Sequence, residues 1–265
     1  MNKYNVINIT NKLKLKDSQQ VFTNTLVDDL KTIRDSTPHI DRIIVRGGAI
    51  LDSVKDLKQK DIDLFYTYRD KGKLKSGCFC TQISEEISKL DLRLVSKVLP
   101  FDLGHFELNE PITDVIDKNC GFFAPFSDYV AMICMDENGE FWSNEAAYYF
   151  LENNIYETRP ECWLYWQITF SSGELSNVSL AQITAFLRGI KILYYKKFTS
   201  IGPDYAELVK NIPVVLKASL HSRDAKVYVE GKMSRLKLTP EIISEVLLDV
   251  CPAMERKIVN CFKLL

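Results

Sequence analysis

The sequence predicts an α+β protein with two domains. The first, residues 1–145, is expected to contain a mixed sheet and is called the head below. The second, residues 146–265, is expected to be mostly helical and is called the neck-like domain. The first part contains short β-branched or alternating runs, separated by glycine turns, that are typical of strands. Beyond about residue 146 the apolar residues recur every three or four positions, as they do on amphipathic helices. A chain of 265 residues that is 46% hydrophobic is long enough for two such domains.

Charge and cysteine content narrow the class of protein only slightly. The formal net charge is −1, so any contact with nucleic acid would need a local basic patch. The seven cysteines are scattered without the paired spacing of a zinc site, and we expect free thiols in a reducing compartment. No segment approaches the ~20 apolar residues that span a bilayer. We therefore expect a soluble, cytoplasmic protein without a membrane partner.

The head is predicted to begin with an amphipathic helix over residues 18–36. A β-branched run at 43–45 predicts a strand that leads into the Gly-Gly pair at 47–48. Helical spacing returns over 50–57, and the alternating residues 61–66 predict another strand. The local order is therefore strand, glycine turn, short helix, strand.

The remaining elements follow from the same patterns. Further strands are expected in the head over 92–98, 106–108 and 112–116. The pair Asn138-Gly139, which follows an apolar run, favours a tight hairpin. In the second domain helices are expected over 180–195, 205–220 and 240–248, the last with Thr239 as its cap and Pro240 in its first turn.

Asp61 and Asp63 are the candidate metal ligands. Alternate residues of a strand share a face, so their carboxylates are expected side by side. Adjacent anions repel unless a cation lies between them, and a pair of Mg²⁺ (or Mn²⁺) ions roughly 3.5–4 Å apart serves this purpose in phosphoryl transfer. Gly47 and Gly48 complement the acids, because glycines between a strand and a helix let the backbone approach phosphate. A lone D-x-D is usually a solvated edge, so the prediction depends on the order and separation of both features.

These residues resemble the signature of a known family. Arg46-Gly47-Gly48-Ala49 followed by Lys60-Asp61-Ile62-Asp63-Leu64 is similar to class II CCA-adding enzymes and bacterial poly(A) polymerases, members of the DNA polymerase β-like nucleotidyltransferase superfamily. The segment 128–140 is similar to the family's Asp-Phe-Thr-Ile-Asn strand and its Asp-Gly hairpin, and 186–191 to its neck-helix Leu-Arg-Ala-Ile-Arg. The resemblance implies a head that carries the metals and a helical neck that covers the nucleotide.

The resemblance also implies nucleotide-binding residues. It assigns this role to Gly47, Gly48, Asp128, Arg188 and Lys191. Arg188 and Lys191 are spaced i, i+3 on a predicted helix, so they would project together toward a triphosphate, although an ordinary solvated face is the alternative.

A third carboxylate usually joins the pair of aspartates, as a metal ligand or as the base for the attacking hydroxyl. Asp114 is the choice for this catalytic role, because it lies in a predicted strand before the hairpin. Glu107 and Asp117 compete with it.

The sequence departs from the family at five positions. Leu51 and Ser127 stand where the family has arginines. Ala181, Gln182 and Ala185 occupy the positions of the charged set that selects CTP and ATP, and none can form those charged hydrogen bonds. True CCA synthesis is therefore not favoured.

The predicted function is metal-dependent transfer of a nucleoside monophosphate from a nucleoside triphosphate to an acceptor hydroxyl. An RNA 3′ end is the favoured acceptor, as in tRNA nucleotidyltransferases and poly(A) polymerases. A small molecule or a protein is the alternative, because 265 residues leave little room for the tRNA-gripping domains of the relatives. A third interpretation, suggested by Leu51 and Ser127, is a degenerate relative that binds nucleotide or a partner without turnover. Retention of both aspartates argues against it.

Overall fold

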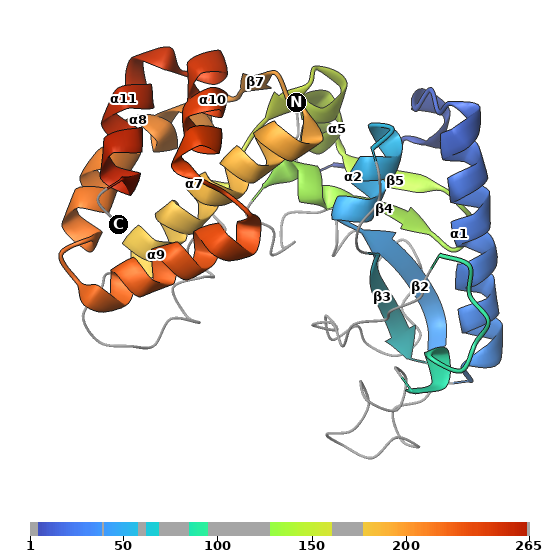
Figure 1. Ribbon diagram of the computed structural model, residues 1–265. Coiled ribbons are helices and arrows are strands. Elements are labelled where there is room, and N and C mark those ends of the chain that lie inside the picture. The colour runs from blue at the N-terminus through green and yellow to red at the C-terminus, as the bar shows by residue number, and fades with distance from the viewer. Residues whose placement is uncertain are drawn as a thin grey trace. The chain divides into compact units, whose positions relative to one another are not determined.

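The structure is a computed structural model that describes residues 5–38, 40–57, 62–68, 85–94, 128–160 and 177–263. The chain forms two compact units. The head unit comprises Met1–Ala124 and Ala131–Tyr148, and the helical unit comprises Pro125–Val130 and Tyr149–Leu265. The first unit combines a sheet with helices and the second is mostly helical, which confirms the predicted α+β class (Figure 1).

The head unit is built on a five-stranded sheet with the order β1-β5-β4-β2-β3. Its strands are β1 (Val6–Asn8), β2 (Ile40–Arg46), β3 (Asp63–Tyr68), β4 (Ile133–Asp136) and β5 (Phe141–Asn144). All four neighbouring pairs are antiparallel, so the described part of the sheet holds no parallel pair of the kind a mixed sheet contains. The two longest strands, β2 and β3, lie side by side at one edge (Figure 1).

Two helices cover the sheet. Helix α1 (Asp17–Ser36) packs against β2 and α2, and α2 (Gly48–Val54) packs against β2 and β4. On α1 the residues Leu26, Leu30 and Ile33, spaced as the sequence predicts, are fully buried. Each such side chain stabilises the fold by roughly 1.5–3 kcal/mol through its burial. The Gln19 side-chain amide donates to the Ser53 carbonyl at 2.7 Å and so ties α1 to the end of α2.

The hairpin predicted from Asn138-Gly139 is confirmed. Strands β4 and β5 pair through it, Gly139 has φ +83°, and the Asp136 carboxylate accepts hydrogen bonds from the amides of Asn138 (2.8 Å) and Glu140 (3.0 Å). The preceding run does not continue the strand, because Tyr129–Met132 forms a 3₁₀ helix, η3. The segment 128–140, which resembles the family's Asp-Phe-Thr-Ile-Asn strand and its hairpin, therefore becomes extended only at Ile133.

The buried Glu137 of this hairpin forms hydrogen bonds with neighbouring elements. The Glu137 side chain is 1% exposed and accepts hydrogen bonds from Arg34 (3.1 Å), Arg42 (2.9 Å) and the Ile43 amide (2.8 Å). A buried carboxylate is tolerated when its oxygens are satisfied by charged and backbone donors. Glu137 thus holds the end of α1 and strand β2 together.

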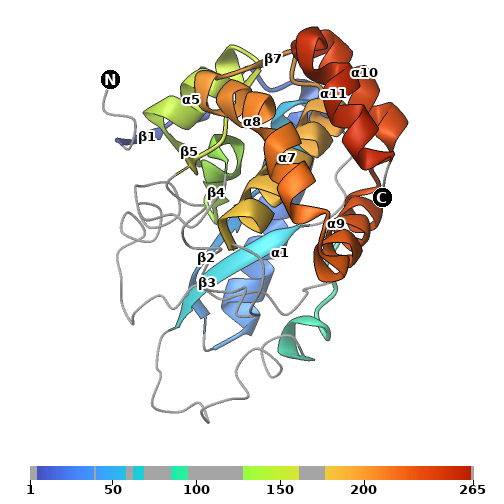
Figure 2. The same cartoon turned by 90° about the vertical axis from the view of Figure 1, so that its left-hand side faces the viewer.

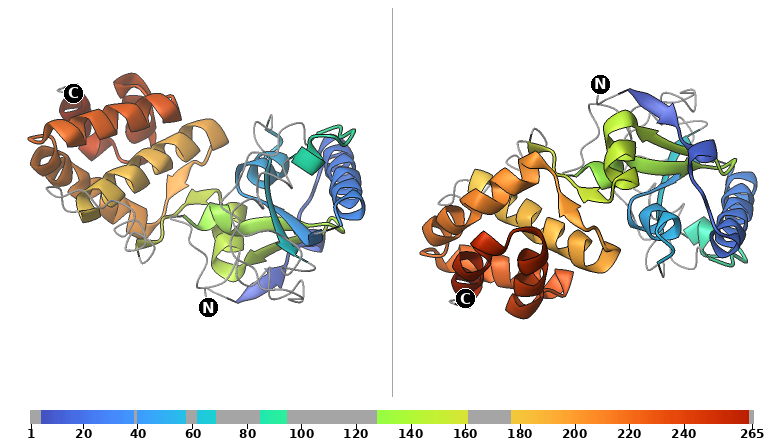
Figure 3. Two further views of the ribbon diagram at one scale, coloured as in Figure 1. Left: turned by 90° about the horizontal axis from the view of Figure 1, so that it is seen from below. Right: turned by 90° about the horizontal axis from the view of Figure 1, so that it is seen from above.

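The helical unit is arranged around one long helix. It contains the end of α5 (Glu145–Glu152), then β6 (Ile155–Tyr156), α7 (Asn177–Lys196), β7 (Ser200–Ile201), α8 (Pro203–Ser219), α9 (Arg223–Leu236), α10 (Pro240–Val250) and α11 (Pro252–Phe262). Helix α7 packs against α8, α9 and α10, and Figures 2 and 3 show these helices gathered around it. Thr239 accepts from the Ile242 amide at 3.4 Å, which confirms the predicted cap of α10. None of the helices in the described ranges is long and apolar enough to cross a membrane.

Helices α7 and α8 approach closely at a glycine. A Cβ placed on Gly189 would lie 2.3 Å from ring atoms of Tyr205. The Tyr205 hydroxyl donates to the Phe186 carbonyl at 2.8 Å, one turn earlier on α7. Gly189 therefore makes room for a fully buried aromatic ring in the core of the helical unit.

Several predicted strands differ from the structure. Residues 92–94, at the start of the strand expected over 92–98, form bends and irregular backbone. There the Asp29 carboxylate accepts from the amides of Arg93 (3.1 Å) and Leu94 (2.7 Å), which replaces the ladder hydrogen bonds of a strand. The strands expected over 106–108 and 112–116 lie outside the described residues.

Candidate active site

The glycine turn between β2 and α2 is the centre of the predicted site. Gly47 has φ +74° and ψ −135°, a conformation that side-chain-bearing residues rarely adopt. Its amide donates to the Ile133 carbonyl of β4 at 3.4 Å, and its carbonyl accepts from the Leu51 amide of α2 at 3.1 Å. The turn is therefore fixed to the sheet on one side and to the helix on the other.

Gly48, the first residue of α2, has a different environment. A Cβ placed on it would meet no atom of the described residues within 4 Å. The first amides of a helix have no partner within that helix, so they are suited to an anion. Gly48 thus exposes main chain at the start of α2.

Strand β3 brings Asp63 to this turn. Asp63 begins the strand and pairs in register with Arg46, the residue before Gly47. Arg46 pairs in turn with Cys134 of β4. The main chain of Asp63 therefore lies one residue away from the glycine turn, on the neighbouring strand.

The register also assigns position 63 to one face of the sheet. Leu64 and Tyr66 of β3 are 2% and 4% exposed and pair with the buried Val45 and Ile43. Residues of a strand alternate between faces and cross-strand partners share one. Position 63 thus belongs to the opposite face, which it shares with the position of Arg46.

The other predicted catalytic residues are not placed by the structure. Asp61 and Asp114 lie outside the described residues, and for Asp63 only the main chain is described. Within the described ranges no group of three or more His, Cys, Asp and Glu side chains is arranged to hold a metal ion. The predicted metal ligands and the third carboxylate stay predictions.

In the helical unit two predicted nucleotide-binding residues contact each other. The Arg188 side chain of α7, 40% exposed, donates through Nε to the fully buried Asp128 carboxylate. Because the carboxylate is buried, its evident effect is to orient the guanidinium. Direct contact of Asp128 with a nucleotide stays a prediction.

A second acid, Glu157, which the sequence did not single out, precedes the residue that bridges to Asp128. Glu157 accepts hydrogen bonds from the amides of Thr158 (2.9 Å), Asp204 (3.1 Å) and Tyr205 (2.7 Å), so it caps the N-terminus of α8. Burial raises the pKa of Glu157, and these amide donors oppose the shift. Thr158 forms a β-bridge with Asp128, so the cap and the Asp128–Arg188 pair are adjacent in the fold. The signal in the sequence was only an acid two residues before Arg159-Pro160.

Lys191, the other predicted phosphate ligand, lies one turn after Arg188 on α7. The structure adds a cation that the sequence analysis missed, since Lys232 of α9 experiences the charges of Arg188, Lys191 and Arg235. Sequence patterns could not find it, because Lys232 follows Lys191 by 41 positions in the chain.

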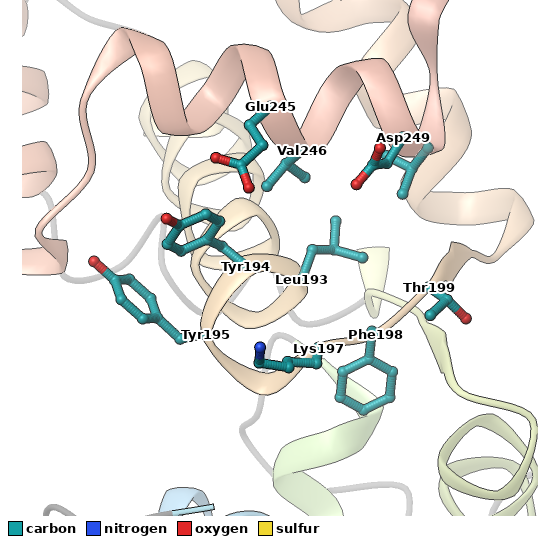
Figure 4. Close-up of a pocket in the computed structure, with 10 residues that line it drawn as sticks. Leu193, Tyr194, Tyr195, Lys197, Phe198, Thr199, Glu245, Val246 and Asp249 are labelled. Carbon is teal, nitrogen blue, oxygen red and sulfur yellow. The ribbon is translucent and has the colours of Figure 1, made fainter.

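A pocket of about 650 Å³ lies elsewhere in the helical unit, between the end of α7 and α10 (Figure 4). Its lining combines apolar residues such as Leu193 and Val246 with polar ones such as Lys197, Glu245 and Asp249. The described lining includes no residue of the predicted site.

No protein-family model and no curated protein matches the chain. Solved structures of similar fold include a CCA-adding enzyme from Thermotoga maritima in complex with tRNA, with 13% identity, a TM-score of 0.47 and coverage of 98% of this chain and 55% of that one. A CCA-adding enzyme in complex with CTP has 12% identity, a TM-score of 0.49 and coverage of 98% and 55%. The chain thus spans about half the length of these proteins.

Proposed function

We propose that this chain is a divalent-metal-dependent nucleotidyltransferase that moves a nucleoside monophosphate from a nucleoside triphosphate to an acceptor hydroxyl, with an RNA 3′ end as the favoured acceptor. The observation that carries the proposal is the register of β3, in which Asp63 pairs with Arg46 beside the glycine turn. This brings the main chain of one predicted metal ligand next to the predicted phosphate-binding turn.

Asp61 and Asp63 would hold the metal. Position 63 lies on the face of the sheet opposite the buried Leu64 and Tyr66. Asp61 precedes the first residue of β3 by two positions and lies outside the described residues. Carboxylate oxygens are the ligands that Mg²⁺ and Mn²⁺ prefer. When bound, the metal supplies Lewis-acid stabilisation of the triphosphate and of the leaving pyrophosphate.

The glycine turn would receive the phosphates. The conformation of Gly47 turns the chain sharply into α2, and the main chain of Gly48 is not crowded by any described atom. Backbone amides at such a turn can donate to phosphate oxygens without a side chain in the way. A site for the phosphates of a nucleoside triphosphate needs backbone amides that are accessible in this way.

The transfer itself balances as a displacement at phosphorus. The acceptor oxygen forms a bond to the α-phosphorus, the bond from that phosphorus to the β-phosphate oxygen breaks, and pyrophosphate leaves. The hydroxyl proton must pass to a base, for which Asp114 is the proposed residue. The protein's part is to align the acceptor and the leaving group and to hold the developing charge.

The identity of the acceptor is tested by following which molecules receive a labelled nucleoside monophosphate. The protein is incubated with each α-labelled nucleoside triphosphate and Mg²⁺, together with either total RNA or a small-molecule extract. Label at RNA 3′ ends, removable by 3′-exonuclease, is expected. Label in small molecules or in protein would assign the same chemistry to another acceptor. Absence of any transfer or pyrophosphate release with all four triphosphates, with Mg²⁺ or Mn²⁺, would contradict the proposal.

A further inference from the structure

The pocket between the end of α7 and α10 is lined by two carboxylates that the proposed transfer reaction does not use. Glu245 and Asp249 are spaced i, i+4 on α10, so they lie on one side of the helix. Figure 4 shows both carboxylates on the side of α10 that faces the end of α7. Residues at this spacing have Cβ atoms roughly 5–6 Å apart, and like charges there repel each other. The pocket therefore contains a pair of mutually repelling anions.

Neither carboxylate is compensated within the part of the chain that the structure describes. Among those residues, Glu245 and Asp249 form no hydrogen bond and no ion pair. Helix α10 contains a third acid, Glu241, and no basic residue. Lys197 is the basic residue of the described lining, so two negative charges and one positive charge give this lining a net charge of −1. A positively charged ligand would compensate the pair of acids.

Apolar and aromatic side chains form much of the remaining lining. Buried apolar side chains line the pocket at Leu193, Phe198 and Val246. The rings of Tyr194 and Tyr195 meet edge to face, with their centroids 5.0 Å apart. Tyrosine rings attract cations to their faces, and apolar side chains favour contact with methylene groups. The pocket thus combines negative charge with surfaces that suit an alkyl chain.

These features together favour one class of ligand. The acids would repel an anion, and a bare metal ion would gain nothing from the apolar side chains. A neutral apolar molecule would leave both carboxylates uncompensated. An alkylammonium ion suits both parts of the lining, since its ammonium group can pair with a carboxylate while its methylene groups contact the apolar side chains. The volume of about 650 Å³ is typical of a small-molecule site.

We propose that this pocket binds an aliphatic diamine or polyamine, with one ammonium group at Glu245, another at Asp249 and the alkyl chain against Leu193 and Val246. Two ammonium groups joined by a short alkyl chain match two carboxylates that are one helical turn apart. A lysine side chain of a partner protein has the same ammonium chemistry but a single charge, so it matches the pair less well. The site uses only residues of the helical unit and does not rest on the proposed nucleotidyltransferase function.

The test measures binding of spermidine to the full chain by isothermal titration calorimetry, in EDTA, without nucleotide and at about 0.15 M salt, which screens weak surface attraction. Putrescine, butylamine and 1,4-butanediol share a four-carbon chain and carry two, one and no charges. Glu245→Gln and Asp249→Asn each remove one carboxylate from the pocket. Glu241→Gln makes the same charge change in the first turn of α10, outside the described lining, and is the matched control. N-acetyl-lysine amide represents the side chain of a protein partner.

Spermidine and putrescine are expected to bind, butylamine to bind more weakly and 1,4-butanediol not to bind. Each pocket variant is expected to weaken spermidine binding about fivefold, with an unchanged unfolding curve, while Glu241→Gln changes it by less than about twofold. Absence of saturable spermidine binding, or unchanged affinity in both pocket variants, would overturn the proposal. Equal weakening by Glu241→Gln would also overturn it, because the effect would then be one of general charge. Tighter binding of N-acetyl-lysine amide than of putrescine would assign the pocket to a protein side chain and contradict the polyamine assignment.

Discussion

Asp63 is the cross-strand partner of Arg46, the residue that precedes the glycine turn. Because Gly47 is hydrogen-bonded to β4 and to α2, the relation between turn and strand is set by the sheet and not by a free loop. A site built on strands holds its groups more precisely than one built on loops. This relationship is the physical basis of the proposed metal and phosphate site.

The two glycines of the turn are expected to respond differently to alanine. Gly47→Ala places a Cβ at φ +74°, and we expect a loss of about 1–3 kcal/mol in the free energy of unfolding of the head. Gly48→Ala meets no described atom and improves helix propensity, so we expect unchanged or slightly higher stability together with weaker triphosphate binding. Denaturant unfolding and triphosphate titration measure both effects. If Gly48→Ala binds triphosphate normally, the phosphates do not approach this main chain.

Glu137 is expected to be important for the stability of the head. Glu137→Ala leaves the buried Ile43 amide without its acceptor and separates Arg34 and Arg42 from their shared partner. We expect a loss of about 2–4 kcal/mol, since removal of one partner of a buried ion pair is costly. Glu140→Ala, an exposed acid in the same hairpin, is the control and is expected to change stability by less than about 0.5 kcal/mol. Equal effects of the two variants in urea unfolding would contradict this role.

Gly189 is expected to tolerate no side chain. Gly189→Ala brings a methyl group to 2.3 Å from the Tyr205 ring, and such overpacking costs about 1–3 kcal/mol. Gly231→Ala, at a helix position where an added Cβ meets no described atom within 4 Å, is the control and should be neutral or stabilising. The melting temperatures of the two variants provide the comparison, and a neutral Gly189→Ala would show that α8 can shift away without cost.

Lys232 is expected to lower stability near neutral pH. With a pKa of about 8 in the folded chain and 10.5 ordinarily, the unfolded state binds more protons between these values, so stability rises as pH increases through this window. Lys232→Met should therefore be more stable than the original chain at pH 7, with the difference shrinking toward pH 10. Chemical unfolding of both proteins at several pH values tests this. A variant less stable at pH 7 would mean that the lysine's charge is favoured in the fold.

Local sequence patterns predicted much of the fold. The period of Leu26, Leu30 and Ile33 predicted α1, and Asn138-Gly139 predicted the hairpin, because both signals lie within a few neighbouring residues. Helix α9 was missed because only Ala225, Val229 and Met233 of its fourteen residues are buried, which leaves a weak apolar period. The parallel pair of β6 and β7 was missed because each strand has two residues, 45 apart in the chain.

For the candidate site, too, the sequence predicted some features and missed others. The order of the glycine pair and Asp63 was visible in the sequence because both belong to one short segment. The capping role of Glu157 and the approach of Lys232 to Lys191 depend on the packing of α8 and α9 against α7, and no local pattern encodes those contacts.

The most direct test of the central claim is pyrophosphate release by variants of the two predicted metal ligands. Asp61→Asn and Asp63→Asn keep the size of the side chain and remove its charge, and each is expected to reduce Mg²⁺-dependent release from a nucleoside triphosphate by on the order of 10³-fold, with the unfolding curve unchanged. Asp35→Asn, which changes an exposed acid at the end of α1, is the matched control and is expected to release pyrophosphate at the original rate. Release at the original rate by Asp63→Asn would contradict the assignment of β3 as the metal-binding strand.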